Sequence, residues 1–289
     1  KKSKKEGGVK RMKKIALLTL LIAAVAVPAF AFDLGGYTGP VQFHISVYSW
    51  GRTYSSSDLP NYNGSGTGRV DTYGLITVDT IDGLDSTTGT WNIIWTPSAT
   101  ERLEGLFWGL SDDVGYVNPD GKFIFNEING QIELYLNGPS DNPLSILNDP
   151  QVPPDGNPNW KPTDNYNATD GQLFLTANFV PGIITGDNIH TYTETIDSLT
   201  GPFTGSGHGY LAVSGGAYAS MFDTNGYLGG SADLLMGINL QGAAAGNPNW
   251  TYGRDPVEGY IIPEPTTMLL LGSGILGLLG MAGIRRKKA

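Results

Sequence analysis

Few residues in this sequence are able to do acid–base or nucleophilic chemistry. The 289 residues contain three histidines, His44, His190 and His208, and no cysteine. The absence of cysteine excludes thiol nucleophiles, thiolate metal sites and iron–sulfur clusters. None of the histidines has the HExxH or paired-histidine spacing of a zinc site. Ser206 lies two residues before His208, but turn formation explains this Gly-Ser-Gly stretch better than a catalytic triad does.

Paired carboxylates are a second source of chemistry. Glu127 and Glu133 flank an Asn-Gly pair, and Glu101 lies close to Glu104. Two carboxylates that face each other across a cleft are the core of a glycosidase site. Acidic residues are so frequent here that close pairs arise by chance, and no strand carries an alternating acidic triplet. We therefore expect a protein that is not an enzyme, with a secreted glycosidase as the weaker alternative.

Two acidic stretches carry oxygen ligands of the kind that calcium prefers. Asp223 and Asn225 lie in an Asp-Thr-Asn-Gly turn, and Asp112 and Asp113 are adjacent. Hard cations bind carboxylate and amide oxygens, but neither stretch has the terminal Glu of an EF-hand loop. A structural calcium is the only cofactor that the sequence suggests, and plain turns are the alternative interpretation.

A five-residue sequence that occurs twice contains two tryptophans of interest. The sequence Gly-Asn-Pro-Asn-Trp occurs twice and ends at Trp160 and at Trp250. Each copy sets an Asn-Pro turn before the indole. One interpretation is a pair of structural tryptophans that cap the core. The other is a pair of exposed indoles that stack on sugar rings, as in a carbohydrate-binding module.

The sequence patterns around these residues predict β-strands. Residues 41–48 alternate apolar and polar side chains, the period-two pattern of a half-buried strand. Further short apolar runs between turn residues predict strands at 75–78, 91–95, 106–110, 172–180, 189–195, 210–214, 217–222 and 231–240. Asn129-Gly130 within residues 123–136 is a hairpin signal. About ten short strands and no helical periodicity predict an all-β fold, a single β-sandwich for which a jelly roll is one arrangement.

The N-terminus predicts export. Basic residues 10–14 precede an apolar run at 15–27 and the sequence Pro28-Ala29-Phe30-Ala31. These are the three parts of a secretory signal peptide, with cleavage expected after Ala31 by the secretion machinery. Met12 is the expected initiator, so we interpret residues 1–31 as an over-called start followed by the signal peptide. Residues 32–260 then form the extracellular all-β domain.

The C-terminus predicts a membrane segment. Pro263, Glu264 and Pro265 precede residues 266–284, which carry no charge. As a helix this stretch would be roughly 28 Å long, close to the bilayer hydrocarbon thickness. Four basic residues close the chain and are expected to stay cytoplasmic as an anchor; they are Arg285, Arg286, Lys287 and Lys288. An ordinary single-pass anchor is the plainer interpretation.

A Pro-Glu-Pro triplet, a transmembrane segment and a basic end in this order resemble the PEP-CTERM sorting signal, here residues 261–289. In that family a membrane-embedded transpeptidase-like enzyme, the exosortase, recognises the tail. The resemblance implies processing near Pro263-Glu264-Pro265 in a Gram-negative cell, often alongside exopolysaccharide production. It implies transient anchoring in the inner membrane and a final place at the cell surface or in the extracellular matrix.

The net charge of the exported part of the chain limits the classes of partner that it can bind. Residues 32–265 contain six Lys and Arg against 26 Asp and Glu, a net charge of −20 that the whole-chain value of −9 hides. Such a charge argues against nucleic-acid binding, which needs basic residues against phosphate. We expect a structural or adhesive protein of an exopolysaccharide matrix, biofilm or floc, with a lectin-like carbohydrate-binding module as the alternative.

Overall fold

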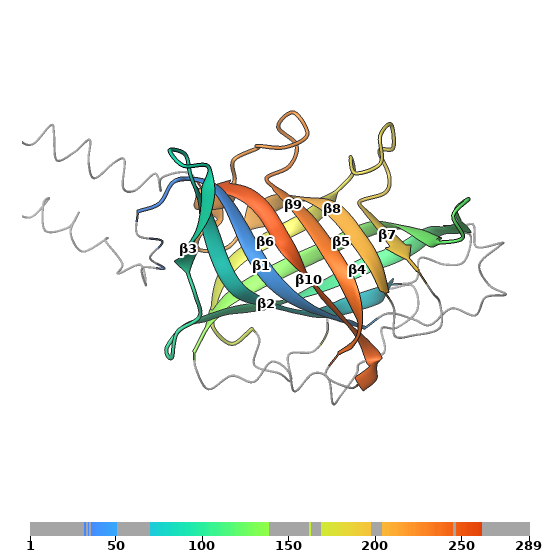
Figure 1. Cartoon of the computed structure of the whole chain (residues 1–289), viewed down its shortest axis with the longest axis horizontal. Helices are drawn as coiled ribbons and strands as arrows, with labels where there is room; N and C mark the ends of the chain where they lie inside the picture. Colours follow the sequence, from blue (N-terminus) through green and yellow to red (C-terminus); the bar gives the residue numbers. More distant parts are fainter. Residues whose placement is uncertain are drawn as a thin grey trace, which may run out of the picture. The chain divides into compact units, whose positions relative to one another are not determined.

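The computed structural model describes residues 36–50, 70–138, 169–197, 204–244 and 247–261, together with Phe32, Leu34 and Pro162. The chain divides into two units, Lys1–Gly35 and Gly36–Ala289, and all the strands lie in the second. The elements are β1 (Gly39–Trp50), β2 (Val70–Asp85), β3 (Thr90–Trp95), β4 (Arg102–Val117), β5 (Phe123–Asn137), β6 (Gln172–Val180), β7 (Tyr192–Ile196), β8 (Thr204–Gly215), α2 (Ala219–Phe222), β9 (Leu234–Ala244) and β10 (Asn247–Ile261) (Figure 1). In the described part of the chain no helix has the length and apolar character needed to span a membrane.

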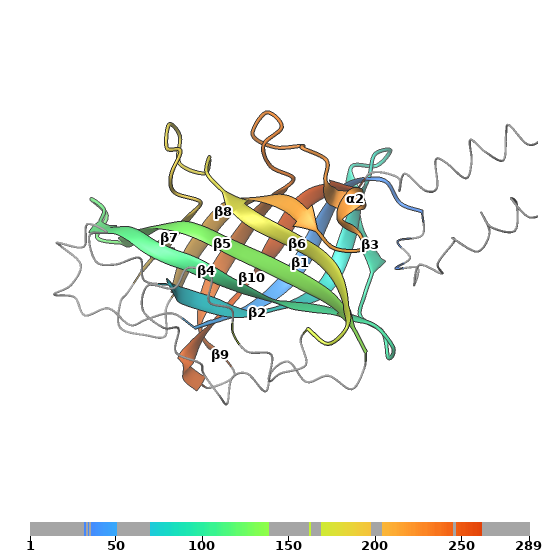
Figure 2. The same cartoon turned by 180° about the vertical axis from the view of Figure 1, so that it is seen from behind.

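The strands form one antiparallel sheet that closes on itself. Its order is β1-β10-β9-β8-β6-β5-β4-β2, and β1 also pairs with β2, so that the path returns to its start. β6 and β7 share the space between β5 and β8: β6 pairs with residues 131–136 of β5, and β7 pairs with residues 123–127 (Figure 2). β3 extends from the far half of β2.

The all-β prediction is confirmed, but the expectation of two packed sheets is wrong. The described strands belong to a single sheet. A sandwich leaves edge strands with unpaired backbone groups, whereas closure gives β1 a partner on each side. Sequence periodicity shows which face of a strand is buried, but it does not show whether that face packs against a second sheet or against the inside of its own.

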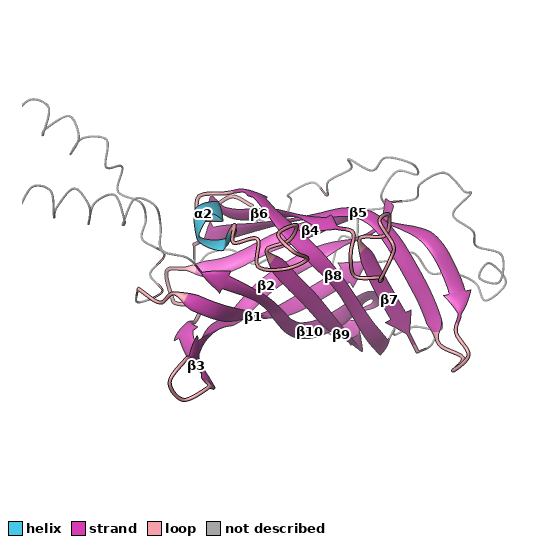
Figure 3. Ribbon diagram, turned by 90° about the horizontal axis from the view of Figure 1, so that it is seen from above, coloured by secondary structure: helices cyan, strands magenta, loops and turns pink. Residues whose placement is uncertain are grey.

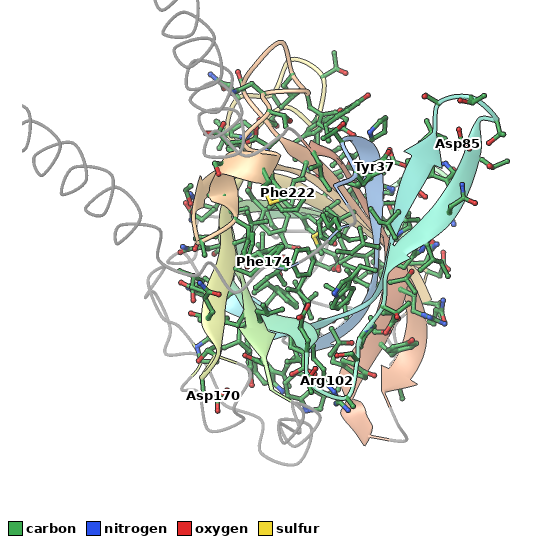
Figure 4. The ribbon with its side chains drawn as sticks, turned by 90° about the vertical axis from the view of Figure 1, so that its left-hand side faces the viewer. Tyr37, Asp85, Arg102, Asp170, Phe174 and Phe222 are labelled. Atoms are coloured by element: carbon green, nitrogen blue, oxygen red, sulfur yellow. The ribbon has the colours of Figure 1, made fainter. Side chains whose placement is uncertain are left out.

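Alternation in β1 shows how the sequence builds the interior. Val41, Phe43, Ile45 and Val47 are buried, as residues 41–48 predict. Side chains of successive residues point to opposite faces of a strand, so these four share the inner face. Figure 4 shows side chains filling the space that the strands enclose, Phe174 and Phe222 among them.

The interior is packed with little free space. A cavity of about 30 Å³ is lined only by apolar side chains, including Phe43, Ile76, Leu134 and Val257. A second, of about 20 Å³, lies among Phe107, Leu110 and other side chains from several strands. Cavities of this size hold about one or two water molecules each. The enclosed space therefore forms a core.

Two segments differ from their predicted structures. Residues 217–222, predicted as a strand, contain helix α2, which contacts β6, β8 and β10 (Figure 3). Phe222 of this helix packs against Phe43 and Phe174, with ring centroids 5.4 and 5.7 Å away. A single helical turn is too short to show helical periodicity, so its buried residues resemble a strand in the sequence.

The predicted hairpin at Asn129-Gly130 is instead an irregularity within the continuous strand β5. Both residues have positive φ, 65° and 96°, and β4 runs alongside them without a break in direction. Gly109, opposite Gly130, also has positive φ (81°), and the Trp108–Gln131 and Leu110–Asn129 pairs keep one register, so no extra residue is inserted here. The alternation reverses across this site, because Phe125 and Glu127 precede it on the inner face whereas Ile132 and Leu134 follow it there.

Candidate functional site

The chain enters and leaves the closed sheet at the same end. Gly39, the first residue of β1, pairs with Ile261, the last residue of β10, and Pro40 pairs with Tyr260. This ladder continues to the Ser49–Thr251 pair, and Ile261 is buried. The first and last strands of the sheet therefore hold each other in place up to the last described residue.

Three tyrosines from separate segments meet next to this end, and we call Tyr210, Tyr227 and Tyr260 the tyrosine patch. The Tyr210 and Tyr227 ring centroids lie 6.0 Å apart, and those of Tyr227 and Tyr260 lie 6.3 Å apart. Neighbouring rings are tilted by 43° and 51°. Tyr260 is 42% exposed, and the other two are partly exposed. The patch thus presents adjoining aromatic surfaces to solvent.

A buried carboxylate positions the central tyrosine. Asp233 accepts hydrogen bonds from the backbone N–H groups of Val213 (2.7 Å), Thr224 (2.7 Å) and Asn225 (2.6 Å). Two residues after Asn225, Tyr227 forms an isolated antiparallel β-bridge with Ala232. Hydrogen bonds from backbone N–H groups to an ionised carboxylate are among the stronger ones in proteins. The segment that carries Tyr227 is therefore fixed to β8 and β9.

Polar groups border the patch on β10. Gln42 donates through Nε2 to Glu258 Oε1 at 3.0 Å. Burial, most of all, together with the negative charge of Glu258 and the neighbouring tyrosines raises the pKa of Tyr227 to about 12. The Tyr227 phenol is therefore neutral at physiological pH and available as both donor and acceptor.

Residue 262 follows the last strand directly, and there a family match begins. Residues 262–287 match the PEP-CTERM protein-sorting motif. The chain carries a PEP-CTERM sorting motif. The prediction from the Pro-Glu-Pro triplet is confirmed, and the motif implies an exported protein that an exosortase recognises and that is processed at the membrane. No curated protein and no solved structure matches the chain.

The sorting motif itself lies outside the described residues, as does the signal peptide. The same holds for the triplet Pro263, Glu264 and Pro265 and for the membrane segment 266–284. The basic residues Arg285, Arg286, Lys287 and Lys288 are outside it too. The described part of the chain ends at Ile261, the last residue of β10, one residue before the motif begins.

The structure describes only one of the two tryptophans of the repeated pentapeptide. Trp160 lies outside the described residues. Trp250 is 1% exposed and packs with Tyr73, Leu75, Leu106 and Trp108. An indole buried in this way has no free face for a sugar, so the prediction of an exposed stacking residue is wrong for Trp250.

The predicted calcium residues do not form one cluster. Asp223 accepts a hydrogen bond from Asn225 Nδ2 at 3.2 Å, but Asp233 is the carboxylate that organises their turn. Among the residues that the structure describes, no group of three or more His, Cys, Asp or Glu could hold a metal ion. Calcium binding at either stretch stays a prediction.

The adjacent carboxylates Asp112 and Asp113 have separate environments. Asp112 is buried and pairs across the strands with Glu127. Asp113 Oδ2 lies 3.0 Å from His190 Nε2, and Asp187 Oδ2 lies 2.6 Å from His190 Nδ1. The hydrogen bond from His190 holds the pKa of Asp187 at about 2, helped by the backbone N–H groups of Ile189 and His190. Both ring nitrogens of His190 thus contact carboxylates, which ties the β6–β7 connection to β4.

Of the two carboxylate pairs considered for glycosidase chemistry, Glu127 and Glu133 are separated by the reversed alternation at Asn129-Gly130. Glu127 shares the inner face with Tyr192, its cross-strand partner. Glu133 lies between the inward-facing Ile132 and Leu134, on the outer face, where Tyr135 donates to it. Two carboxylates on opposite faces of one sheet cannot act on the same bond.

Sequence reasoning missed the tyrosine patch and the Asp187–His190–Asp113 contacts. A local signal existed for part of the second, because Asp187 accepts from the N–H groups two and three residues later, a common Asp turn. The patch had no local signal. Its members are at least 17 residues apart and meet only through strand register.

Proposed function

We propose that this chain is an exosortase substrate whose folded body serves a structural or adhesive role in an extracellular polysaccharide matrix, biofilm or floc. The observation that carries the proposal is the position of the sorting motif relative to the sheet. The body closes through the Gly39–Ile261 pair, and the motif begins at the next residue. Processing near Pro263-Glu264-Pro265 then removes the tail without removing any strand.

A structural role rather than catalysis is supported by the way the body uses its polar residues. Two cavities within the described strands are small, about 30 and 20 Å³, and the larger is lined only by apolar side chains. His190 is held by two carboxylates, and His44 lies 3.3 Å from Asp82. Within the described strands, no hydrogen bond connects Ser206 to His208. These groups stabilise the sheet and its connections.

The test is the intact mass of the exported protein from cells with and without the exosortase. We expect a species that begins at Phe32 and ends near Pro263-Glu264-Pro265 only in cells that contain the enzyme. Replacing all three triplet residues by alanine should leave the full tail in both strains. The matched control is Glu258→Gln, which changes a carboxylate on the folded side of Ile261 and should be processed normally. A full tail in both strains for the wild type would identify an ordinary membrane anchor instead.

A further inference from the structure

We propose that the tyrosine patch is a binding site for a neutral polysaccharide, on which sugar rings stack against Tyr260, Tyr227 and Tyr210. The proposal rests on the matrix role proposed above and names the class of partner and the surface that meets it. It replaces the repeated tryptophans with a different set of aromatic residues, because Trp250 is buried and these three rings are partly exposed.

The chemistry of the patch suits a polyhydroxylated ligand. Tyrosine offers a flat apolar face together with a hydroxyl group, and it loses little side-chain entropy when it binds. The apolar faces of sugars pack on such rings, while their hydroxyl groups need donors and acceptors nearby. Glu258, which shares a cross-strand row with Tyr210 and whose charge acts on Tyr227, supplies an acceptor, and Gln42, which donates to Glu258, supplies an amide next to it. Three successive rings at 6.0 and 6.3 Å give a chain several consecutive contacts.

The patch is built before any ligand arrives. Asp233 fixes the Thr224–Asn225 segment through two backbone hydrogen bonds, and the Tyr227–Ala232 bridge fixes the central ring. Tyr260 lies against Gly226: a Cβ at that glycine would stand only 3.2 Å from Tyr260 Cδ2. The Cδ2–Cε2 edge of the Tyr260 ring therefore lies close to the Gly226 backbone. Preorganised side chains spend less conformational entropy on binding.

The negative charge of the exported body favours neutral over anionic ligands. The exported body carries a net charge of −20, and Glu258 borders the patch. Anionic polysaccharides and anionic lipid surfaces are attracted by clustered Lys and Arg, and the residues of this patch and its border include neither. A neutral polymer pays no such electrostatic cost. The site thus fits a neutral glycan better than a membrane surface or an acidic polysaccharide.

The experiment is affinity electrophoresis of the exported protein, recovered from its host, in native gels. The gels contain hydroxyethylcellulose or laminarin as neutral glucans, or alginate as an anionic polysaccharide. Flotation with vesicles of phosphatidylethanolamine and phosphatidylglycerol tests the membrane surface. We expect retardation by at least one neutral glucan, and neither retardation by alginate nor flotation.

Matched variants locate the site. Tyr260→Ala and Tyr227→Ala should weaken retardation by about tenfold or more, the size seen when an aromatic residue central to a binding surface is truncated. Tyr260→Phe keeps the ring and should retain most of the binding. Tyr116→Ala is the control, because Tyr116 is a tyrosine of similar exposure, 46% against 42%, on β4.

Three results overturn the proposal. These are a wild type that neither neutral glucan retards, a Tyr260→Ala variant that binds like the wild type, and flotation with vesicles that Tyr260→Ala abolishes. The last would assign the patch to the membrane surface. None of these bears on the intact-mass test, which reports sorting alone, so failure of the patch and failure of the proposed export are separable.

Discussion

Aromatic residues gather on the outer face of the sheet in two regions with opposite exposure. The first lies across β10, β1, β2 and β4 and contains Trp250, Tyr73 and Trp108, all buried, with Tyr48, Trp50 and Tyr252 packed against them. The second is the tyrosine patch, where Tyr260 is 42% exposed. Residue type alone does not separate the two. The degree of burial decides which rings stabilise the fold and which remain available to a partner.

The composition of the two regions fits this division. The buried cluster combines tryptophans and leucines with the buried Tyr73, whose ring meets that of Trp250 edge to face at 5.7 Å. The patch holds only tyrosines, each with a hydroxyl group that remains satisfied in water. An aromatic residue that is both rigid and partly polar is tolerated at an exposed site without opening a large apolar surface. The comparison therefore predicts that substitutions in the first region affect stability and those in the second affect binding.

The largest effect is expected from Trp250→Ala. Removing a buried indole leaves a cavity among Tyr73, Leu75, Leu106 and Trp108, and such truncations cost about 3–5 kcal/mol in the free energy of unfolding. Urea unfolding followed by tryptophan fluorescence measures the loss. Retardation by neutral glucans should not change under conditions in which the variant stays folded. A variant as stable as the wild type would place Trp250 outside the core and restore it as a stacking residue.

A smaller loss is expected from Asp233→Asn, which acts on the support of the patch. The carboxylate accepts three backbone N–H groups, and an amide cannot accept all of them with both of its terminal atoms. We expect a loss of about 2–3 kcal/mol in stability together with weaker glucan binding, because Tyr227 loses its fixed position. Asp223→Asn is the control: Asp223 is exposed, and its stability change should stay within about 0.5 kcal/mol. Equal effects of the two variants would contradict the role given to Asp233.

The sequence reveals those features that depend on near neighbours in the chain. Residues 41–48 show the face of β1 that is buried, and the Pro-Glu-Pro triplet with its apolar run and basic end indicates the sorting motif. Both signals are contained within a few consecutive residues. The Asn129-Gly130 pair is also local, but positive φ occurs here within a continuing strand as well as in hairpin turns, so the local signal alone does not distinguish the two.

Features that depend on register could not be predicted. Tyr210 pairs with Leu235, and Leu235 pairs in turn with Glu258, two residues before Tyr260. Those two ladders bring residues fifty positions apart onto one face. Closure of the sheet through the β1–β2 pairing is a long-range property of the same kind. For the tryptophans of the repeated turn the sequence left a structural and a stacking role open, and the burial of Trp250 decides for the structural one.

A modest effect is expected from Gly226→Ala, which tests how tightly the patch is built. The added methyl group would lie 3.2 Å from Tyr260 Cδ2, so the ring must move by a few tenths of an ångström. We expect a loss of at most about 1 kcal/mol in stability and roughly threefold weaker glucan binding. The control is Gly89→Ala in the β2–β3 turn, where nothing lies within 4 Å of the added Cβ but φ is positive, so backbone strain is the only cost. Unchanged glucan binding by Gly226→Ala would show that the position of Tyr260 is adjustable.

The smallest effect is confined to alkaline pH and reports on the central residue of the tyrosine patch. The pKa of Tyr227 is about 12 in the folded protein against 10.0 for a free tyrosine, mainly because of burial and then because of Glu258. A raised folded-state pKa stabilises the fold fully below pH 10, and this contribution is lost as the pH rises through 12. Absorbance at 295 nm should show a late ionisation step that Tyr227→Phe removes and that Glu258→Gln moves toward lower pH. The phenol of Tyr192, inside the sheet, has a pKa well above its ordinary value because of burial, so it should ionise only when the sheet opens. If Glu258→Gln leaves the late step in place, Glu258 does not border Tyr227 closely enough to contribute to a binding site there.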